Sequence, residues 1–241
     1  MSQRVRLEWF EHTAQLVLAG LVRAEIEAEL KTLLKDKLSI GGTAVRGNRE
    51  KVITILLRTW VDVDEDLEPL HLDGLQLLRD LPLPDRLVVH WGMAMAAYPF
   101  WGQVAETVGR LLHLQGNVGA AEVQRRMREL RGERETVARA ARRVLRAFND
   151  WGVLVDSARK GTYRASSQVE VEQPGLAAFL AEAWLRGSGA KAAPVNSLLG
   201  SPSLFPFSLE PTALAALARH PRLEVYRHGG DEQVFGLREQ G

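Results

Sequence analysis

Apolar residues recur every three or four positions along most of the chain, a spacing typical of amphipathic helices. The spacing predicts helices over 5–19, 23–37, 48–60, 67–81, 85–98, 100–115, 120–131, 135–148, 175–186 and 211–219. Short β-branched or alternating runs predict strands only at 153–155, 162–164, 222–227 and 232–238. We therefore predict a mainly α protein with a small C-terminal α+β region, in which a helix is followed by a β-hairpin.

The helix predicted over 135–148 separates two kinds of side chain more sharply than its neighbours do. Its apolar positions are Val137, Ala141, Val144, Leu145 and Phe148. The opposite side carries Arg139, Arg142, Arg143 and Arg146. At about 1.5 Å per residue the helix is roughly 20 Å long, enough to lie in the major groove of DNA. We expect one side to be core and the other to be a cationic surface, with Thr136 as the N-cap.

The elements around this helix complete a recognisable order. Two helices with a glycine-containing turn at 116–119 come before it, and two short strands joined by Arg159-Lys160-Gly161 come after it. Residues 100–165 thus resemble the winged helix-turn-helix superfamily, most clearly over 137–155. The resemblance implies binding to double-stranded DNA, with the third helix in the groove and the hairpin as a basic wing.

Positive charge is concentrated on the same segment. Residues 110–164 hold 13 Lys or Arg against 6 Asp or Glu. The rest of the chain holds 18 Lys or Arg against 24 Asp or Glu, so the whole chain has a net charge of only +1. The predicted DNA-binding residues are Arg125, Arg128, Arg134, Arg139, Arg142, Arg143, Arg146, Arg159, Lys160 and Arg164. A weaker, secondary set lies at the start of the helix over 48–60 and consists of Arg46, Arg49 and Lys51.

Changes in composition predict three parts. Residues 1–98 form a helical domain whose segment 5–60 is either a three-helix packing unit or a second helix-turn-helix-like unit. Residues 99–168 form the winged module. Residues 169–241 form a C-terminal region with a proline-rich stretch, for which we expect a packing or dimerisation role. The helix over 85–98 is apolar on nearly every side, so we expect it to be buried, with His90 as a hydrogen-bonded core residue.

Several chemistries are not supported by the sequence. The chain has no cysteine, so disulfides, thiolate catalysis and cysteine-based zinc sites are excluded. A Gly-x-x-x-x-Gly spacing at 42–47 lacks the Lys-Ser/Thr pair of a phosphate loop, and the acidic run at 62–66 lacks the glycine of a calcium loop. The six histidines show no metal-ligand spacing. We expect no enzyme activity, cofactor or metal. No stretch reaches eighteen apolar residues, so we expect a cytoplasmic protein without membrane contact.

The sequence therefore favours a non-enzymatic DNA-binding protein, either a transcriptional regulator or a component of phage defence. The layout of 38–60, followed by helices and a small winged unit, is similar to BrxA, a helical accessory protein of BREX phage-exclusion islands, and that similarity implies the defence role. The alternative is a winged-helix adaptor that binds other proteins, and a protein partner or a homodimer fits either hypothesis.

Overall fold

Helices make up most of the fold. The structure is a computed structural model that describes residues 1, 3–38, 47–211, 214–229 and 232–238. Helix accounts for 63 % of it and strand for 13 %, which confirms the prediction of a mainly α protein. The α-helices are α1 (Leu7–Leu18), α2 (Arg23–Leu33), α3 (Asn48–Trp60), α4 (Glu68–Asp80), α5 (Arg86–Ala97), α6 (Pro99–Gln115), α7 (Ala120–Arg131), α8 (Glu135–Asp150), α9 (Pro174–Ser188), α10 (Val195–Leu199) and α11 (Leu214–Arg219).

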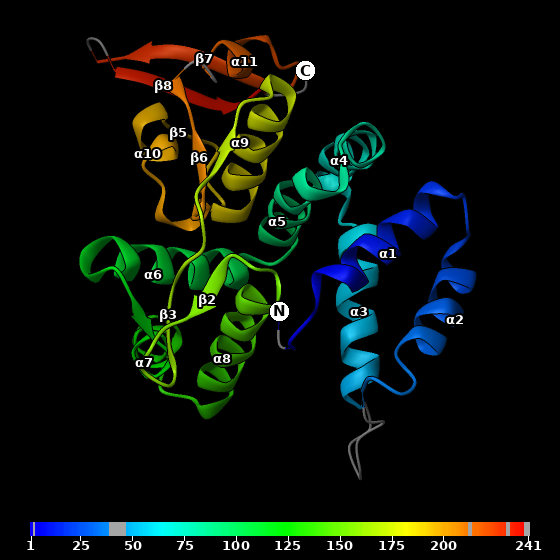
Figure 1. Cartoon of the computed structure of the whole chain (residues 1–241). Helices are drawn as coiled ribbons and strands as arrows, with labels where there is room; N and C mark the ends of the chain where they lie inside the picture. Colours follow the sequence, from blue (N-terminus) through cyan, green and yellow to red (C-terminus); the bar gives the residue numbers. More distant parts are fainter. Residues whose placement is uncertain (2, 39–46, 212–213, 230–231, 239–241) are drawn as a thin grey trace.

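The most deeply buried helix is α5, as its apolar sequence predicts. Every residue from Val88 to Ala97 is buried, and α5 packs against α3, α4, α6 and α9. Helix α9 approaches α5 closely at Gly92. A Cβ added at Gly92 would lie only 2.7 Å from the ring of Phe179 on α9. Figure 1 shows α5 between the N-terminal helices α1–α3 and the C-terminal elements around α9.

Residues 99–165 form a module of three helices and a small sheet. The order along the chain is α6, β1 (Val118–Gly119), α7, α8, β2 (Leu154–Asp156) and β3 (Thr162–Ala165). The sheet has the strand order β1-β3-β2 and is antiparallel throughout, with Val118 opposite Tyr163 and Val155 opposite Arg164. Strand β1 was not predicted. It ties the start of α7 to the β2–β3 hairpin, and we call this unit the α6–β3 module.

The C-terminal part contains more strands than the sequence predicts. The predicted hairpin is present as β7 (Leu223–His228) and β8 (Glu232–Leu237), and β5 (Ala192–Pro194) pairs with the second of them. A separate parallel pair is formed by β4 (Val169–Val171) and β6 (Phe207–Leu209). Three single-turn 3-10 helices complete the described elements: η1 (Glu65–Leu67), η2 (Leu83–Asp85) and η3 (Pro202–Leu204).

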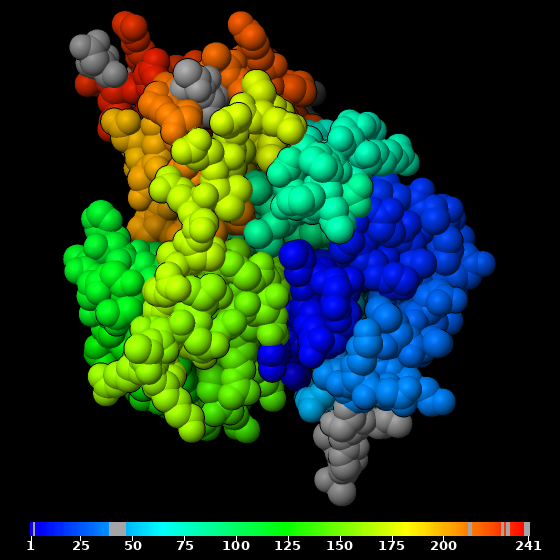
Figure 2. All heavy atoms as spheres, viewed as in Figure 1, coloured from blue at the N-terminus to red at the C-terminus, as the bar shows by residue number. Residues whose placement is uncertain are grey.

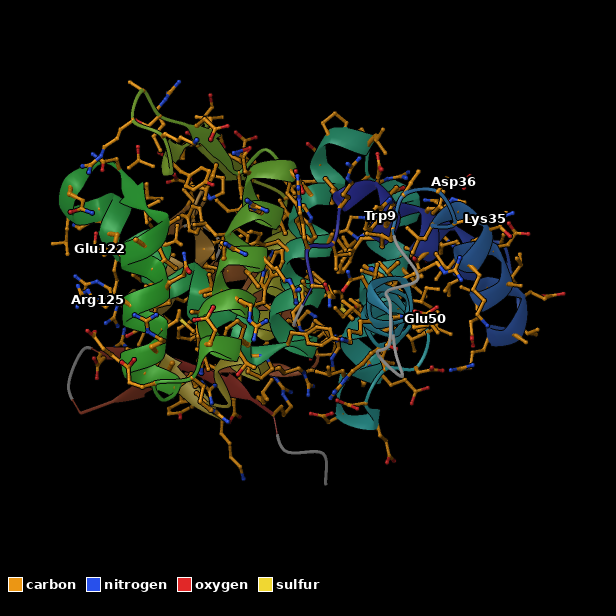
Figure 3. All side chains as sticks on the ribbon, turned by 90° about the horizontal axis from the view of Figure 1, so that it is seen from below. Trp9, Lys35, Asp36, Glu50, Glu122 and Arg125 are labelled. Atoms are coloured by element: carbon orange, nitrogen blue, oxygen red, sulfur yellow. The ribbon has the colours of Figure 1, made fainter. Side chains whose placement is uncertain are left out.

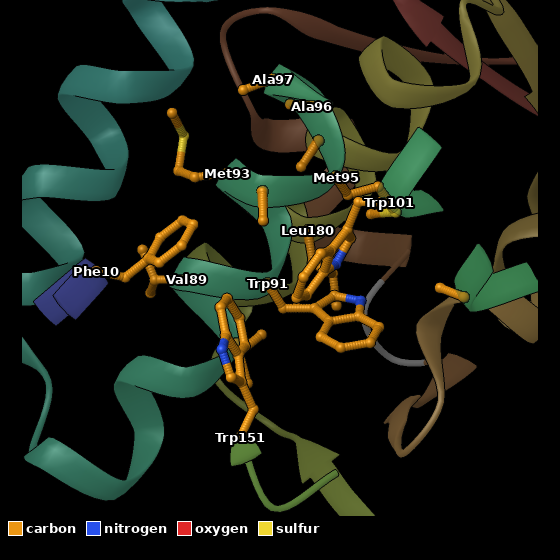
Figure 4. Close-up of a cluster of buried hydrophobic side chains, with 14 of the residues drawn as sticks. Phe10, Val89, Trp91, Met93, Met95, Ala96, Ala97, Trp101, Trp151 and Leu180 are labelled. Carbon is orange, nitrogen blue, oxygen red and sulfur yellow. The ribbon is translucent and has the colours of Figure 1, made fainter. Parts of the chain in front are cut away.

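A group of buried aromatic rings joins the module to the rest of the chain (Figure 4). Trp91 of α5 lies 5.4 Å from Trp101 of α6 and 4.8 Å from Phe148 of α8, measured between ring centroids. Phe205 and Phe207 add edge-on contacts to Trp91, so this part of the proline-rich stretch packs into the core. The buried side chains form one cluster across all three predicted domains among the described residues. The division into three domains therefore stays a prediction.

Candidate nucleic-acid interface

The core-facing side of α8 is formed by the residues that the sequence pattern selected. Val137, Ala141, Val144, Leu145 and Phe148 are all buried. The rings of Trp101 and Trp91 hold Phe148 at centroid distances of 4.7 and 4.8 Å. The helix begins at Glu135, so the prediction of Thr136 as N-cap is wrong. Arg134 holds that position, and no side chain caps the helix.

The opposite side of α8 presents arginine. The side chains of Arg139, Arg142 and Arg146 are exposed, and that of Arg143 is half-buried. Oε1 of Glu135 lies 3.8 Å from Nε of Arg139, one helical turn away. Arg142 and Arg146 have no hydrogen bond or ion pair of their side chains within the described residues. We call these four residues the arginine face.

The arginine face raises its own electrostatic energy. Burial lowers the pKa of the Arg143 guanidinium, and the positive charges of Arg139 and Arg142 lower it further. Burial and the neighbouring charges both disfavour the charged form, although the group stays protonated at neutral pH. A bound anion would relieve this mutual repulsion.

The arginines of α7 are arranged differently. Arg125 pairs with Glu129 at 2.6 Å, Arg126 with Glu122 at 3.2 Å, and Arg128 with Glu133 at 3.1 Å. Glu122 and Arg125 lie on the outer side of α7 in Figure 3. These acids offset the charge of α7, so the predicted residues Arg125 and Arg128 contribute less positive potential than those of α8. Leu130 of the same helix is 60 % exposed.

The β2–β3 hairpin carries a second cationic group of the module. The side chains of Arg159, Lys160 and Arg164 are exposed and have no hydrogen bond or ion pair in the described part of the chain. Gly161 has φ +76° at the tip, and its carbonyl accepts a 2.9 Å hydrogen bond from the backbone N–H of Ala120. This bond fixes the hairpin tip next to the first residue of α7.

Of the remaining predicted residues, Arg134 and Lys51 line the same hollow between α3 and the start of α8. Arg134 is exposed and donates a 3.2 Å hydrogen bond to the carbonyl of Arg131. Of the secondary set, Lys51 is exposed, whereas the side chain of Arg49 is 16 % exposed and lies 3.6 Å from Glu50. Arg46 and the loop predicted at 39–43 lie outside the described residues.

The N-terminal segment is attached to the end of α8, a feature that the sequence analysis missed. Arg4 forms a two-point ion pair with Asp150. The indole N–H of Trp151 donates a 2.9 Å hydrogen bond to the carbonyl of Val5. Figure 2 shows residues near the N-terminus against the α8 region. The partners are 146 positions apart, so no local pattern signals them.

His90 is buried and hydrogen-bonded, and its partner is a carboxylate. Its Nε2 lies 2.8 Å from Oε2 of Glu11 on α1, and Arg86 also contacts Glu11 at 2.5 Å. Burial by itself would raise the pKa of Glu11, but His90, Gln15 and Arg86 outweigh it and lower that pKa to about 2. An open cavity of about 720 Å³ lies beside this group. All three polar partners of the Glu11 carboxylate are internal, so this carboxylate is satisfied without a ligand, whereas Nδ1 of His90 has no hydrogen-bond partner among the described residues.

One set of side chains has the composition of a metal site. Ligand atoms of Asp73, Glu182 and His220 lie within 4.8 Å of one another. However, Nη2 of Arg222 lies 2.5 Å from Asp73 and 2.8 Å from Glu182, so a guanidinium occupies the position between the two carboxylates. We interpret the cluster as an internal ion-pair network that joins α4, α9 and the segment leading to β7.

Comparison with family models, with curated proteins and with solved structures found no match to this chain. In the part of the chain that the structure describes, no helix combines the length and the apolar character needed to cross a membrane.

Proposed function

We propose that the α6–β3 module is a winged helix-turn-helix that binds double-stranded DNA, with α8 in the major groove and the β2–β3 tip against the adjacent backbone. The observation that carries this proposal is the arginine face. Arg142 and Arg146 project from a helix whose other side is fully packed, and the side chain of neither has a hydrogen bond or ion pair with the residues that the structure describes. The order of elements, with the strands β1-β3-β2 beside three helices, supports the same reading.

The chemistry of guanidinium fits this role. Arginine can neutralise phosphates and can also donate two parallel hydrogen bonds to the edge of guanine, so one helix can supply both affinity and selectivity. Each phosphate contact to duplex DNA releases close to one counterion, which makes binding strongly dependent on salt. The proposed role is non-enzymatic.

The test compares two double variants that remove the same charge. Arg142→Ala/Arg146→Ala deletes two unpaired cations of α8, whereas Arg125→Ala/Arg126→Ala deletes two cations of α7 that are paired with glutamates. Binding to a fluorescent duplex of about 20 base pairs is measured by anisotropy at several salt concentrations. If both α8 residues contact phosphate, the first variant lowers the slope of log K against log salt by about 1.8 and weakens binding about 60-fold near 0.1 M salt.

We expect a much smaller loss in the α7 variant, because those arginines are already offset by acids. Equal losses of affinity in the two variants would show that binding depends on net charge alone. If Arg142→Ala/Arg146→Ala binds the duplex with wild-type affinity, α8 is not part of the DNA interface.

A protein adaptor is the second candidate, because the module also exposes two large apolar side chains. Leu114 is 75 % exposed and Leu130 is 60 % exposed. In that case the wild-type chain fails to bind duplex DNA at low salt, and Leu130→Glu abolishes capture of the partner.

Within the DNA-binding proposal, enrichment of a few genomic sites among bound fragments supports a regulator. Uniform binding supports a defence component that contacts DNA without sequence preference.

A further inference from the structure

A groove runs between α3 and the amino-terminal end of α8. It has a volume of about 510 Å³, and its walls include Lys51, Thr54 and Arg58 of α3 together with Arg134, Thr136 and Ala140 beside or on α8. In the view from below, Glu50 marks α3 on one side of the molecule and Arg125 marks α7 on the other (Figure 3). The groove therefore adjoins the module on the side away from α7.

The walls of this groove are positive. Among the described residues that line it there are three cations and no carboxylate. Lys51 is exposed and its ammonium group has no hydrogen bond or ion pair with described residues. Arg134 bonds a carbonyl, which has no net charge, so it keeps its full positive charge. Only Arg58 is offset, by Asp64 at 2.7 Å.

The groove also offers neutral donors suited to phosphate. Thr136, whose side chain carries a hydroxyl, lines it, and no side chain caps the first turn of α8, whose N–H groups carry the positive end of the helix dipole. Arg143 follows Ala140 by three positions and so lies one turn, about 5 Å, farther along the same helix. A chain of phosphates that crosses the arginine face can therefore continue into the groove.

We propose that this groove binds the sugar–phosphate backbone of the duplex whose major groove receives α8, with Lys51 as the principal phosphate contact. The inference rests on the proposed function of the α6–β3 module. It assigns α3 a direct part in DNA binding, so the helices of the N-terminal region extend the interface beyond the module. Backbone contacts position a protein on DNA without reading its sequence, so this surface adds affinity rather than selectivity.

The first experiment measures binding of Lys51→Gln and the control Lys35→Gln to the same duplex of about 20 base pairs. Lys35 is an exposed lysine just beyond α2, away from the groove. Loss of one phosphate contact lowers the salt slope by about 0.9 and weakens binding about eight-fold near 0.1 M salt. We expect this in Lys51→Gln and wild-type behaviour in Lys35→Gln. Equal affinity and slope in the two variants would overturn the inference.

The second experiment locates the DNA directly. The chain has no cysteine, so one introduced cysteine can carry an iron chelate that cleaves nearby DNA strands. Thr54 lines the groove and Thr32 lies on α2; both are exposed and both bond the carbonyl four residues earlier. Labelled Thr54→Cys should cut the bound duplex, whereas labelled Thr32→Cys should not. Absence of cutting from position 54 would also overturn the inference.

The arginine variant separates the two proposals. If Arg142→Ala/Arg146→Ala loses binding while Lys51→Gln behaves as wild type, the groove is not part of the interface and the proposed function of α8 stands. If the wild-type chain does not bind duplex DNA, both proposals fail.

Discussion

Replacing Glu182 with glutamine should lower the free energy of unfolding by about 3 kcal/mol. The carboxylate of Glu182 is fully buried on α9 and accepts hydrogen bonds from Arg186 at 2.9 Å and from Arg222 at 2.8 Å. Removing one partner of a buried ion pair costs about 3 to 5 kcal/mol, because the remaining charge is left in a poorly solvated place. The amide of glutamine keeps the shape of the side chain and removes only the charge.

The lower end of that range applies because the two arginines keep other partners. Nη2 of Arg222 remains 2.5 Å from Asp73, and Nη1 of Arg186 remains 2.5 Å from the carbonyl of Asp66. The entropy of unfolding is about 2.1 cal/mol/K per residue, or roughly 0.5 kcal/mol/K for a chain of 241 residues. A loss of about 3 kcal/mol therefore lowers Tm by about 6 °C.

The control for this prediction is an exposed ion pair of similar geometry. Glu129 lies 2.6 Å from Arg125, and the two side chains are 52 % and 54 % exposed. Glu129→Gln should cost less than about 1 kcal/mol, because water screens such a pair. Calorimetry or urea unfolding of both variants at pH 7 measures the difference. Equal small losses would show that the buried network contributes no more than a surface pair and would refute the reasoning.

Two further predictions concern the core. Burial lowers the pKa of His90, although Glu11 raises it, so the folded-state pKa lies below the ordinary value of 6.5. As pH falls below about 6.5 the unfolded chain takes up this proton first, so stability falls by at most about 1.4 kcal/mol per pH unit. Thermal unfolding measured between pH 7.5 and 5.5 should show a weaker pH dependence of stability in His90→Gln than in wild type. The control His113→Gln, which changes an exposed histidine, should behave as wild type. An unchanged pH dependence in His90→Gln would contradict a lowered pKa of His90 in the folded state. Gly109→Ala would place a Cβ 1.9 Å from the carbonyl oxygen of Pro202, whereas Gly175→Ala meets nothing within 4 Å. The first should therefore destabilise by about 2 kcal/mol or more and the second should not, as urea midpoints would show; equal midpoints would mean that α6 and η3 do not pack so closely.

The helices could be predicted from the sequence because their signal is local. Apolar spacing alone identified the buried side of α8 and the buried helix α5, and both predictions are confirmed by the burial of their side chains. The pairing of α7 arginines could also have been predicted, since Glu122 and Arg126 stand four positions apart, as do Arg125 and Glu129. Neglect of that spacing made α7 look more cationic than it is.

Contacts between distant segments could not be predicted in the same way. Strands β4 and β6 have three residues each and become strands only by pairing across a stretch that includes α9. Glu11 meets His90 across 79 positions, and Arg222 meets Glu182 across 40. The groove beside α8 likewise depends on how α3 is placed by α5. Each of these features is a consequence of tertiary packing, for which the sequence gives no local signal.

The contrast between α7 and α8 is the strongest physical reason to seek an anionic partner. Both helices carry several arginines on their exposed sides, and α7 follows the usual solution of placing glutamates one turn away. In α8 the apolar side is stabilised by burial of Phe148 and its neighbours, worth about 2 kcal/mol or more for each large side chain, so the arginines are not needed for folding. Like charges one turn apart instead cost a few tenths of a kcal/mol per pair. A cluster that slightly destabilises the free protein is a local conflict of the kind found at functional sites, and under the proposed function duplex DNA would supply the compensating charge.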